Sequence, residues 1–347
     1  MASNTGKKIL YILIGLLVLF LIAGSWLYFS LFRSPLVQIE GERTAWLYVH
    51  PDSEWSDVEH SITETMGQES RSPALFFLRA ALKSTPPKVG AYRLSSQATP
   101  IEVYKAVAHG LQTPVKLTFT SRRVPAEIWS QLANGIMADS ASIVQAMTDR
   151  ALLREMGLQD STMAYRLIPN TYEVYWTISP EDLVRRLEKE YEAFWSSERQ
   201  AKAQRIGLTP SEVSILASIV EEESSKTDEY PLIAGLYLNR LRRGIPLQAD
   251  PTVKYAVGDF ALRRILLEHL QVDSPYNTYK VQGLPPGPIR IPSSSAIDGV
   301  LNARSHNYLY MVAKADFSGY HDFSETLAEH NRKARLYRQA LNERGIK

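Results

Sequence analysis

The most extended feature of the hydropathy pattern is an uncharged apolar run of 24 residues, from Ile9 to Phe32. As a single helix this run would be about 36 Å long, which exceeds the bilayer core thickness of about 30 Å. Lys7 and Lys8 precede it and only Arg33 follows closely, so the positive-inside bias favours a cytoplasmic N-terminus. The alternative is a cleaved signal peptide, whose apolar part would span only about 7–15 residues. We therefore expect a cytoplasmic tail at residues 1–8 and an uncleaved transmembrane anchor at residues 9–32.

After a linker at residues 33–43, the pattern changes to short alternating elements. Strand-forming residues at 44–49 and 90–94 enclose two helical stretches, at 55–66 and 74–83. This order of strand, helix, helix and strand resembles the LysM-like domain of extracytoplasmic cell-wall proteins. The resemblance implies a small LysM-like α/β module over residues 44–118. The alternative is a supporting domain without a ligand, because a fold does not determine a function.

The next segment, residues 119–205, has mainly helical signals and is expected to be an intermediate helical region. Its clearest helix begins with Ser179 as N-cap and Pro180 as first residue, and two acids follow in the first turn. From residue 100 onward the pattern predicts helices at 100–110, 125–132, 140–148 and 180–194, with a strand at 115–120.

The C-terminal segment, residues 206–347, has stronger helix signals. Thr209-Pro210-Ser211-Glu212 is a capping box with proline at the first helical position, and the helix that it starts should extend to Glu223. The proline-rich stretch from Ser274 to Ser295 reads as an extended loop. Between them, helices are expected at 231–244, 251–258 and 262–270. The whole chain is therefore expected to be an α+β protein with a mainly helical C-terminal domain.

Composition and charge exclude several classes of protein. The 39 basic and 37 acidic residues give a net charge of +2, which offers no electrostatic reason to expect nucleic acid as a partner. The chain has no cysteine, so disulfides, thiolate catalysis and cysteine-bound zinc are excluded.

The helix from Thr209 to Glu223 carries the first candidate chemistry. On a helical wheel, Ser214, Ser218 and Glu221 share one narrow polar strip, whereas most other positions are apolar. Such a strip predicts the floor of a cleft, with a carboxyl group at one end. Apolar neighbours, the like charges of Glu222 and Glu223 and the negative end of the helix dipole should all raise the pKa of Glu221. A glutamic acid that stays protonated near neutral pH can protonate a glycosidic oxygen. The alternative is a solvated acidic helix end, which is common for charge runs.

Neutral hydrogen-bonding and aromatic residues gather in the sixty residues that follow. Amides, hydroxyls and tyrosines suit sugar hydroxyls and N-acetyl groups. Each residue also has an ordinary structural interpretation, since Asp250 could be a helix N-cap, Asn239 could cap a helix and the tyrosines could belong to the core. Their crowding favours a site. The expected substrate contacts are Ser218, Asn239, Gln248, Asp250, Thr252, Tyr255, Asn277, Thr278 and Tyr279.

Other catalytic chemistries have weaker support. The seven histidines show no close metal-ligand spacing, although His321 and His330 leave a zinc hydrolase as an alternative. There is no nucleophile elbow, phosphate loop or dinucleotide fingerprint. We therefore expect neither a metal nor a cofactor.

The order of motifs resembles one family, the endolytic murein transglycosylases of the MltG (YceG-like) type. The shared segments extend over about 115 residues in the same order and with the same spacing. Three departures stand out: Glu222 occupies a position where the family usually has lysine, the Glu-Gly that follows the module in the family is absent near residues 120–122, and residues 164–172 only partly match the family's pattern. The matching segments are Ala217–Glu223, Asn239–Leu241, Leu247–Val253, Pro275–Tyr279, Gly283–Ile289, His321–Phe323 and His330–Asn331.

The resemblance implies that Glu221 is the catalytic acid of a membrane-anchored lytic transglycosylase. It implies a YceG-like catalytic domain at residues 206–347, at the outer face of the cytoplasmic (inner) membrane. The expected substrate is the bond between N-acetylmuramic acid and N-acetylglucosamine within peptidoglycan strands, with 1,6-anhydro ends as products and termination of nascent strands as the role. Cell-wall synthases, the penicillin-binding proteins, are the expected partners. The alternative from another class is a peptidoglycan-binding scaffold that cuts nothing.

Overall fold

The structure is a computed structural model that describes residues 2–36, 44–66, 85–123, 125–158, 166–262 and 264–345. The chain forms two compact units. The first unit comprises residues 1–117, 135–137 and 173–178, and the second comprises residues 118–134, 138–172 and 179–347. Both contain helices and strands, so the expected mixture of α and β structure is confirmed.

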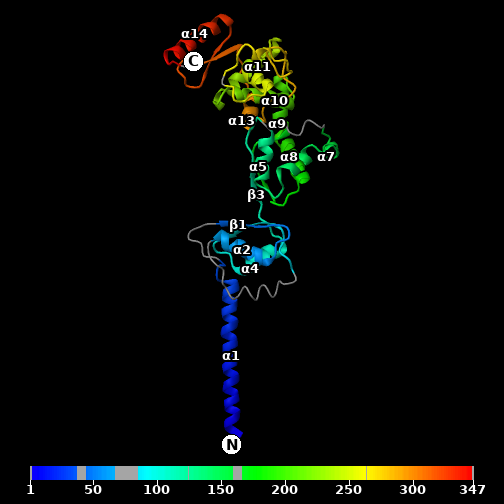
Figure 1. The fold of residues 1–347 in the computed structure, drawn as a ribbon, viewed down its shortest axis with the longest axis vertical. Coiled ribbons are helices and arrows are strands. Elements are labelled where there is room, and N and C mark those ends of the chain that lie inside the picture. Colours follow the sequence, from blue (N-terminus) through cyan, green and yellow to red (C-terminus); the bar gives the residue numbers. More distant parts are fainter. Residues whose placement is uncertain are drawn as a thin grey trace. The chain divides into compact units, whose positions relative to one another are not determined.

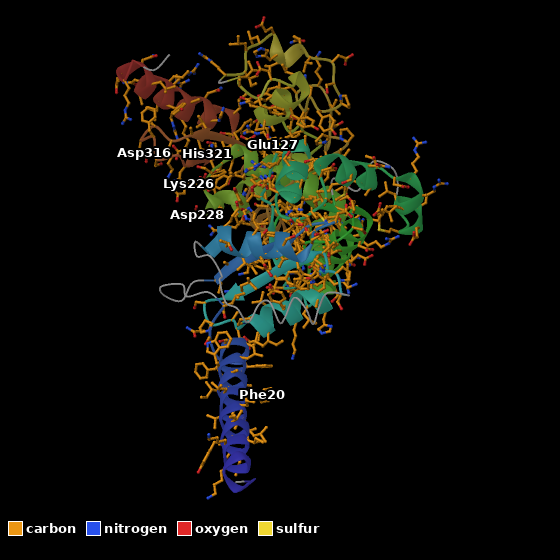
Figure 2. All side chains as sticks on the ribbon, turned by 60° about the horizontal axis from the view of Figure 1, so that its bottom comes forward. Phe20, Glu127, Lys226, Asp228, Asp316 and His321 are labelled. Carbon is orange, nitrogen blue, oxygen red and sulfur yellow. The ribbon has the colours of Figure 1, made fainter. Side chains whose placement is uncertain are left out.

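The apolar run forms one continuous helix, α1 (Ala2–Phe32) (Figure 1). Its segment from Gly6 to Phe32 is long and apolar enough to cross a membrane. The side chains of this segment project outward without packing partners along most of its length, as Figure 2 shows around Phe20, which is 75% exposed. Length and composition are therefore compatible with the expected anchor.

The remainder of the first unit is built around a two-stranded antiparallel sheet. Strand β1 (Thr44–Val49) pairs with β2 (Gly90–Ser95) in a register that joins Thr44 to Ser95. Helices α2 (Trp55–Met66) and α4 (Pro100–His109) complete a core that contains Leu47, Val58 and Val107. The expected helix at residues 74–83 lies outside the described residues, so the LysM-like identity of this module remains a prediction.

Strand β3 (Val115–Thr118) pairs with β4 (Thr171–Val174). The helix with the Ser179 cap is present as predicted, since the Ser179 hydroxyl accepts the amide hydrogen of Asp182. Strand β4 and helices α7 and α9 were not predicted from the sequence. The helices of this part are α5 (Pro125–Ala133), α6 (Ser140–Met147), α7 (Arg150–Glu155), α8 (Pro180–Phe194) and α9 (Ser197–Ile206).

Helix α10 (Pro210–Glu223) is the central element of the second unit and has the predicted bounds. Its residues from Val213 to Val220 are all buried except Ile215, and it packs against α11 (Tyr230–Arg242) and α13 (Ser294–Leu301) (Figure 1). The other elements are α12 (Asp250–Val257), the 3-10 turns η2 (Thr227–Glu229) and η3 (His269–Gln271), the antiparallel pair β5 (Tyr310–Ala313) and β6 (His321–Ser324), and α14 (Leu327–Glu343).

The predicted helix at 262–270 is wrong for the described residues of that stretch, which form only the turn η3 at its end. Leu266 is 47% exposed and Leu267 is 82% exposed. Because these leucines have no core to pack against, helix propensity alone does not sustain a helix here.

A close backbone approach fixes the position of α11. A Cβ atom at Gly235 would lie 2.3 Å from the carbonyl oxygen of Arg304 and 2.6 Å from Nε2 of His306. We expect Gly235→Ala to lower the free energy of unfolding by about 1–3 kcal/mol. The added methyl group would overlap the carbonyl oxygen of Arg304, and this backbone atom can be relieved only if α11 moves. Thermal melting of the purified protein measures this effect, and an unchanged melting temperature would contradict the contact.

Candidate active site

Three consecutive carboxyl groups end α10, and each points in a different direction. Successive residues of a helix are rotated by about 100°, so Glu221 and Glu223 face nearly opposite sides. Ser224, with φ −140° and ψ 141°, then takes the chain out of the helix. The end of α10 therefore presents separate carboxyl groups to separate surroundings.

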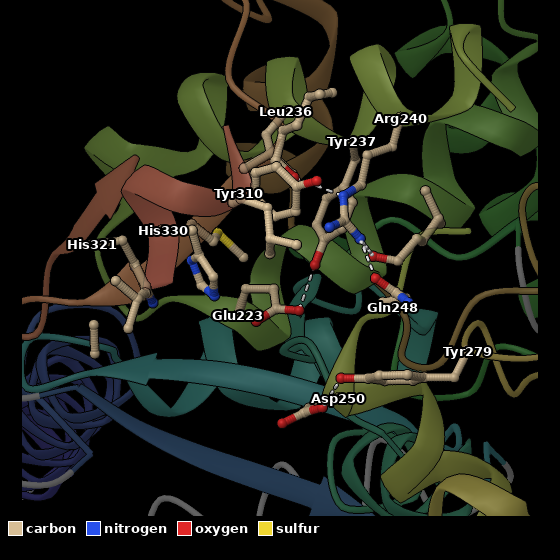
Figure 3. A pocket seen from close by; sticks show the side chains of 16 residues that line it. Glu223, Leu236, Tyr237, Arg240, Gln248, Asp250, Tyr279, Tyr310, His321 and His330 are labelled. Atoms are coloured by element: carbon tan, nitrogen blue, oxygen red, sulfur yellow. Dashed lines mark hydrogen bonds between the residues drawn. The ribbon is translucent and has the colours of Figure 1, made fainter. Parts of the chain in front are cut away.

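Glu223 faces a pocket of about 380 Å³ (Figure 3). The hydroxyl of Tyr237 donates a hydrogen bond of 2.5 Å to Glu223 Oε1. Burial raises the pKa of Glu223 to about 7, and the nearby charge of Asp250 acts in the same direction, against the opposing effects of Tyr237 and Arg240. Burial also raises the pKa of Tyr237, so its phenol remains a donor. The polar residues that line the pocket are Glu223, Tyr237, Arg240, Gln248, Asp250, Tyr279, Tyr310, His321 and His330.

Arg240 holds one wall of this pocket together. Its Nε donates to the carbonyl of Leu309 at 2.7 Å, and its Nη1 donates to the carbonyl of Leu247 at 2.7 Å. Nη1 also donates to Gln248 Oε1 at 3.2 Å, and Gln248 itself has a left-handed backbone with φ 52°. The side chain is only 7% exposed. Arg240 therefore joins α11 to the loop that follows it and to Leu309, which is 69 residues further along the chain, rather than serving as a surface cation at the end of a helix.

Asp250 belongs to the same pocket and is not a helix cap. The N-cap of α12 is Ala249, and the Asp250 carboxylate accepts a hydrogen bond of 2.6 Å from the Tyr279 hydroxyl. Figure 3 shows this pair and the Glu223–Tyr237 pair, of which the first is exposed and the second partly buried. The structure thus brings together Gln248, Asp250 and Tyr279, three of the nine expected substrate contacts.

Glu221 lies on the other side of the helix end. Its Oε2 accepts the backbone amide hydrogen of Ser293 at 2.8 Å, and Arg290 Nε lies 3.5 Å from the same oxygen. The Ser121 hydroxyl is 3.3 Å away, although it donates more closely to the carbonyl of Ile291, at 2.6 Å. These contacts hold the Glu221 carboxyl group in one orientation, and its side chain is 11% exposed.

The polar strip beside Glu221 does not form the floor of a cleft, which corrects the expectation from the helical wheel. Ser218 is fully buried, donates to the carbonyl of Ile215 at 2.7 Å and accepts the amide hydrogen of Ile289 at 3.0 Å. Ser214 is 4% exposed and donates to the carbonyl of Pro210. The strip instead joins α10 to the proline-rich segment.

Four further expected contacts also have structural roles. Thr252 and Thr278 are hydrogen-bonded to each other at 2.7 Å and are buried. Asn277 is fully buried and donates to the carbonyls of Leu270 and Val272. Asn239 donates to the carbonyls at 306 and 308. These hydrogen bonds occupy the polar groups within the protein, so they organise the loops around the pocket. Tyr255 packs against Tyr276, with ring centroids 4.7 Å apart.

The sequence pattern gives no signal for Tyr237, which lies in an otherwise apolar stretch of α11 and reaches the site only through packing. His321 and His330, the residues of the alternative zinc site, both line the pocket. His321 Nδ1 is already paired with Glu229 Oε2 at 2.9 Å, and burial lowers the pKa of His330. Among the described residues, no group of three or more His, Cys, Asp or Glu side chains could hold a metal ion.

Each carboxylate oxygen of Glu222 has an arginine partner, which accounts for an acid at a position where the family usually has lysine. Its carboxylate forms a pair of hydrogen bonds with Arg123, and Arg290 Nη1 donates to it at 2.7 Å. Its side chain is 6% exposed. The hydrogen bond from Arg123 to Glu222 also raises the pKa of that arginine, since it favours the charged form.

We expect Glu222→Lys to lower the free energy of unfolding by about 3 kcal/mol, because it would place three cations together at a poorly solvated position. Denaturant or thermal unfolding measures the loss. Combining it with Arg123→Glu should recover part of the loss. A suitable control is Glu198→Lys, which breaks an exposed pair with Lys202 and should cost less than about 1 kcal/mol. Equal effects of the two charge reversals would contradict the buried network.

Comparison with known proteins gives a consistent classification. The YceG-like family model matches residues 47–336, so the chain belongs to the YceG-like family. The curated relatives named "Endolytic murein transglycosylase" from Bacillus subtilis (strain 168) and from Streptococcus pneumoniae (strain D39) are each 35% identical to it, over 166 and 188 residues. These matches cover 48% and 50% of this chain, but only 45% and 33% of the relatives, so the chain spans less than half of their length.

A solved structure is similar as well. The crystal structure of a yceG-like protein from Listeria monocytogenes aligns with a TM-score of 0.55 and 25% sequence identity. The alignment covers 83% of this chain and 98% of that one. The resemblance inferred from the motifs is therefore confirmed at the level of the family, whereas the roles of individual residues remain predictions.

Proposed function

We propose that this protein is a membrane-anchored lytic transglycosylase that cleaves peptidoglycan strands between N-acetylmuramic acid and N-acetylglucosamine. The observation that carries the proposal is the acidic end of α10, where Glu223 lines a pocket with Gln248, Asp250 and Tyr279, and Glu221 is held in one orientation on the other side of the helix end. The names of the relatives support the same reaction. Amide, carboxylate and aromatic groups in one pocket suit the hydroxyl and N-acetyl groups of a glycan.

Glu221 is the proposed acid. Its Oε2 is held by the Ser293 amide and lies near Arg290, while Oε1 accepts no hydrogen bond within the part of the chain that the structure describes. One oxygen thus fixes the orientation of the group and the other remains for the substrate. Gln248 is the proposed amide contact to the sugar, and Asn277, which is fully buried, is withdrawn from that role.

In the proposed reaction, protonated Glu221 gives its proton to the glycosidic oxygen as the bond between C1 of the muramic acid and that oxygen breaks. The C6 hydroxyl of the same sugar then bonds to C1, and its proton passes to the Glu221 carboxylate. The products are a free hydroxyl on the leaving sugar and a 1,6-anhydro end. Because the attacking hydroxyl belongs to the substrate, its proximity replaces the second carboxylate that ordinary glycoside hydrolases use.

The proposed location follows from α1. As a transmembrane anchor with the N-terminus inside, it would hold the catalytic unit at the outer face of the cytoplasmic membrane. Nascent glycan strands and their synthases are found there, so termination of strand growth and contact with penicillin-binding proteins are part of the proposal.

The test is digestion of purified sacculi by the full-length protein in detergent, followed by mass analysis of the soluble products. Fragments with 1,6-anhydro ends are expected. Reducing ends would indicate a hydrolase and overturn the lyase reaction, and sensitivity to a chelator would point to the zinc alternative. Binding to sacculi without soluble products would favour the non-catalytic scaffold.

A further inference from the structure

A second hollow, of about 910 Å³, adjoins the pocket of the candidate active site, since Glu223 and Asp250 line both. The rest of its lining comes from the end of α10, from α12 and the loop that follows it, from α14 and from Arg123. Its volume is within the range of ligand sites in proteins. A ligand that occupies the pocket can therefore extend into this hollow.

Three cations from three separate segments line the hollow without a carboxylate partner. They are Lys254 on α12, Arg264 in the following loop and Arg338 on α14. Lys254 Nζ donates to the carbonyl of Leu262 at 2.7 Å, and Arg338 Nε donates to the carbonyl of Ala334 at 3.3 Å. Among the residues that the structure describes, none of the three forms an ion pair, and both arginines are exposed. Their charges are therefore free to bind an anion.

The acidic residues around the hollow already have partners of their own. Glu222 is held by Arg123 and Arg290, so these charges largely cancel. Glu223 and Asp250 lie at the boundary with the pocket, and each accepts a hydrogen bond from a tyrosine. The rest of the hollow thus has a net positive charge, which raises the local concentration of anions. We call this space the cationic hollow.

We propose that the cationic hollow binds carboxylates of a peptidoglycan stem peptide while the glycan strand occupies the pocket. The inference rests on the proposed function for its ligand. Stem peptides branch from the muramic acid residues, so one of them begins within a single sugar unit of every bond that the proposed reaction cleaves. Each peptide has free carboxylates at its glutamate and at its terminal alanine, and a guanidinium group can bind a carboxylate through two parallel hydrogen bonds.

The lining of the cationic hollow also distinguishes a peptide from other anions. Leu262, Ile265 and Leu341 provide apolar side chains between the charged ones, and these suit the methyl groups of the peptide's alanines. A lipid-linked pyrophosphate, the other anion of a nascent strand, occurs only at the strand end and has no such methyl groups. A peptide that starts beside the pocket satisfies both the charge and the apolar surface.

The experiment measures binding without turnover. The probe is the disaccharide in which N-acetylglucosamine is linked to N-acetylmuramic acid, because it lacks the bond that the proposed reaction cleaves. The full-length protein in detergent is titrated calorimetrically with this disaccharide carrying a stem peptide, and with the same compound after amidation of the peptide's carboxylates. An exposed ion pair changes an equilibrium constant by up to about fivefold, so two pairs should make amidation raise the dissociation constant about tenfold in low salt. In about 0.5 M salt the difference should fall below about threefold.

Variants test whether the arginines of the cationic hollow are responsible. Arg264→Gln combined with Arg338→Gln should reduce the effect of amidation to below about twofold, and both side chains are exposed, so the fold should be retained. The control is Arg332→Gln, which removes the same charge from an exposed position on α14 outside the hollow and should keep the tenfold effect. Arg264→Glu alone should weaken binding of the peptide-bearing disaccharide but not of its amidated form. This single variant keeps the test decisive if the double variant does not fold.

Equal affinities for the two disaccharides would overturn the inference, and so would a tenfold difference that persists in the double variant. Inorganic pyrophosphate is the probe for the competing anion. Binding of pyrophosphate that depends on Arg264 and Arg338, without any preference for peptide carboxylates, would assign the hollow to phosphate and overturn the inference as well.

The outcome is separate from that of the proposed reaction. A protein that releases anhydro fragments but does not distinguish the two disaccharides loses only this inference. One that prefers the free carboxylates but releases nothing from sacculi loses only the reaction.

Discussion

Replacing Glu221 by glutamine is expected to reduce the release of anhydro-ended fragments from sacculi by about 10³-fold. A glutamine amide fits the space and can still accept the Ser293 amide hydrogen, but it cannot give a proton to the glycosidic oxygen or take one from the C6 hydroxyl. General acid and base catalysis contributes about 10²–10⁴-fold in enzymes, so loss of the only group in both roles should fall within this range. Product release measured by mass analysis, with melting temperature and glycan affinity as checks, gives the result.

A matched control is Glu192→Gln, which makes the same chemical change at an exposed position on α8 and should leave turnover unchanged. Near-normal turnover by Glu221→Gln would remove Glu221 from the acid role. If turnover is lost in Glu223→Gln instead, the acid is the group in the pocket, and the proposed reaction would move to the other side of the helix end.

The second large effect concerns stability. Arg240→Met should lower the free energy of unfolding by about 3–5 kcal/mol. Methionine fills a similar volume but leaves the carbonyls of Pro246, Leu247 and Leu309 without their donor in a buried position. For a unit of this size, the melting temperature should fall by about 10 °C.

Calorimetry on the full chain in detergent measures this change, and it should affect the transition of the second unit. Arg242→Met is the control, since Arg242 is on the same helix but exposed, and its replacement should change stability by no more than about 0.5 kcal/mol. Similar shifts in both variants would mean that the hydrogen bonds of Arg240 contribute little to the fold.

Local signals in the sequence were sufficient for the elements whose ends depend on nearby residues. The capping box of Thr209 and Glu212 and the Ser179 cap each satisfy amide hydrogens within one helical turn, so α10 and α8 have the predicted bounds. The helix predicted at 262–270 depended on periodicity alone, and its exposed leucines find no core. Strand β4 was missed because four residues carry little pattern of their own and form a strand by pairing with β3.

In the candidate site, too, the sequence was sufficient for some residues and not for others. Of the polar residues that crowd together after α10, Gln248, Asp250 and Tyr279 line one pocket. The same residue types at Asn277, Thr278 and Ser218 hold loops together instead. A side-chain amide or hydroxyl is equally suited to a backbone carbonyl and to a sugar, so composition does not distinguish the two roles, whereas burial does.

By itself, the sequence determined the family, the apolar N-terminal helix and the acidic end of α10, because each of these depends on residues that are close together in the chain. Only the tertiary structure decided which carboxyl group meets which partner. Ser293 reaches Glu221 across 72 residues of chain, and Tyr237 reaches Glu223 from another helix. Proton affinity depends on such contacts and on burial, and both arise only when distant segments pack.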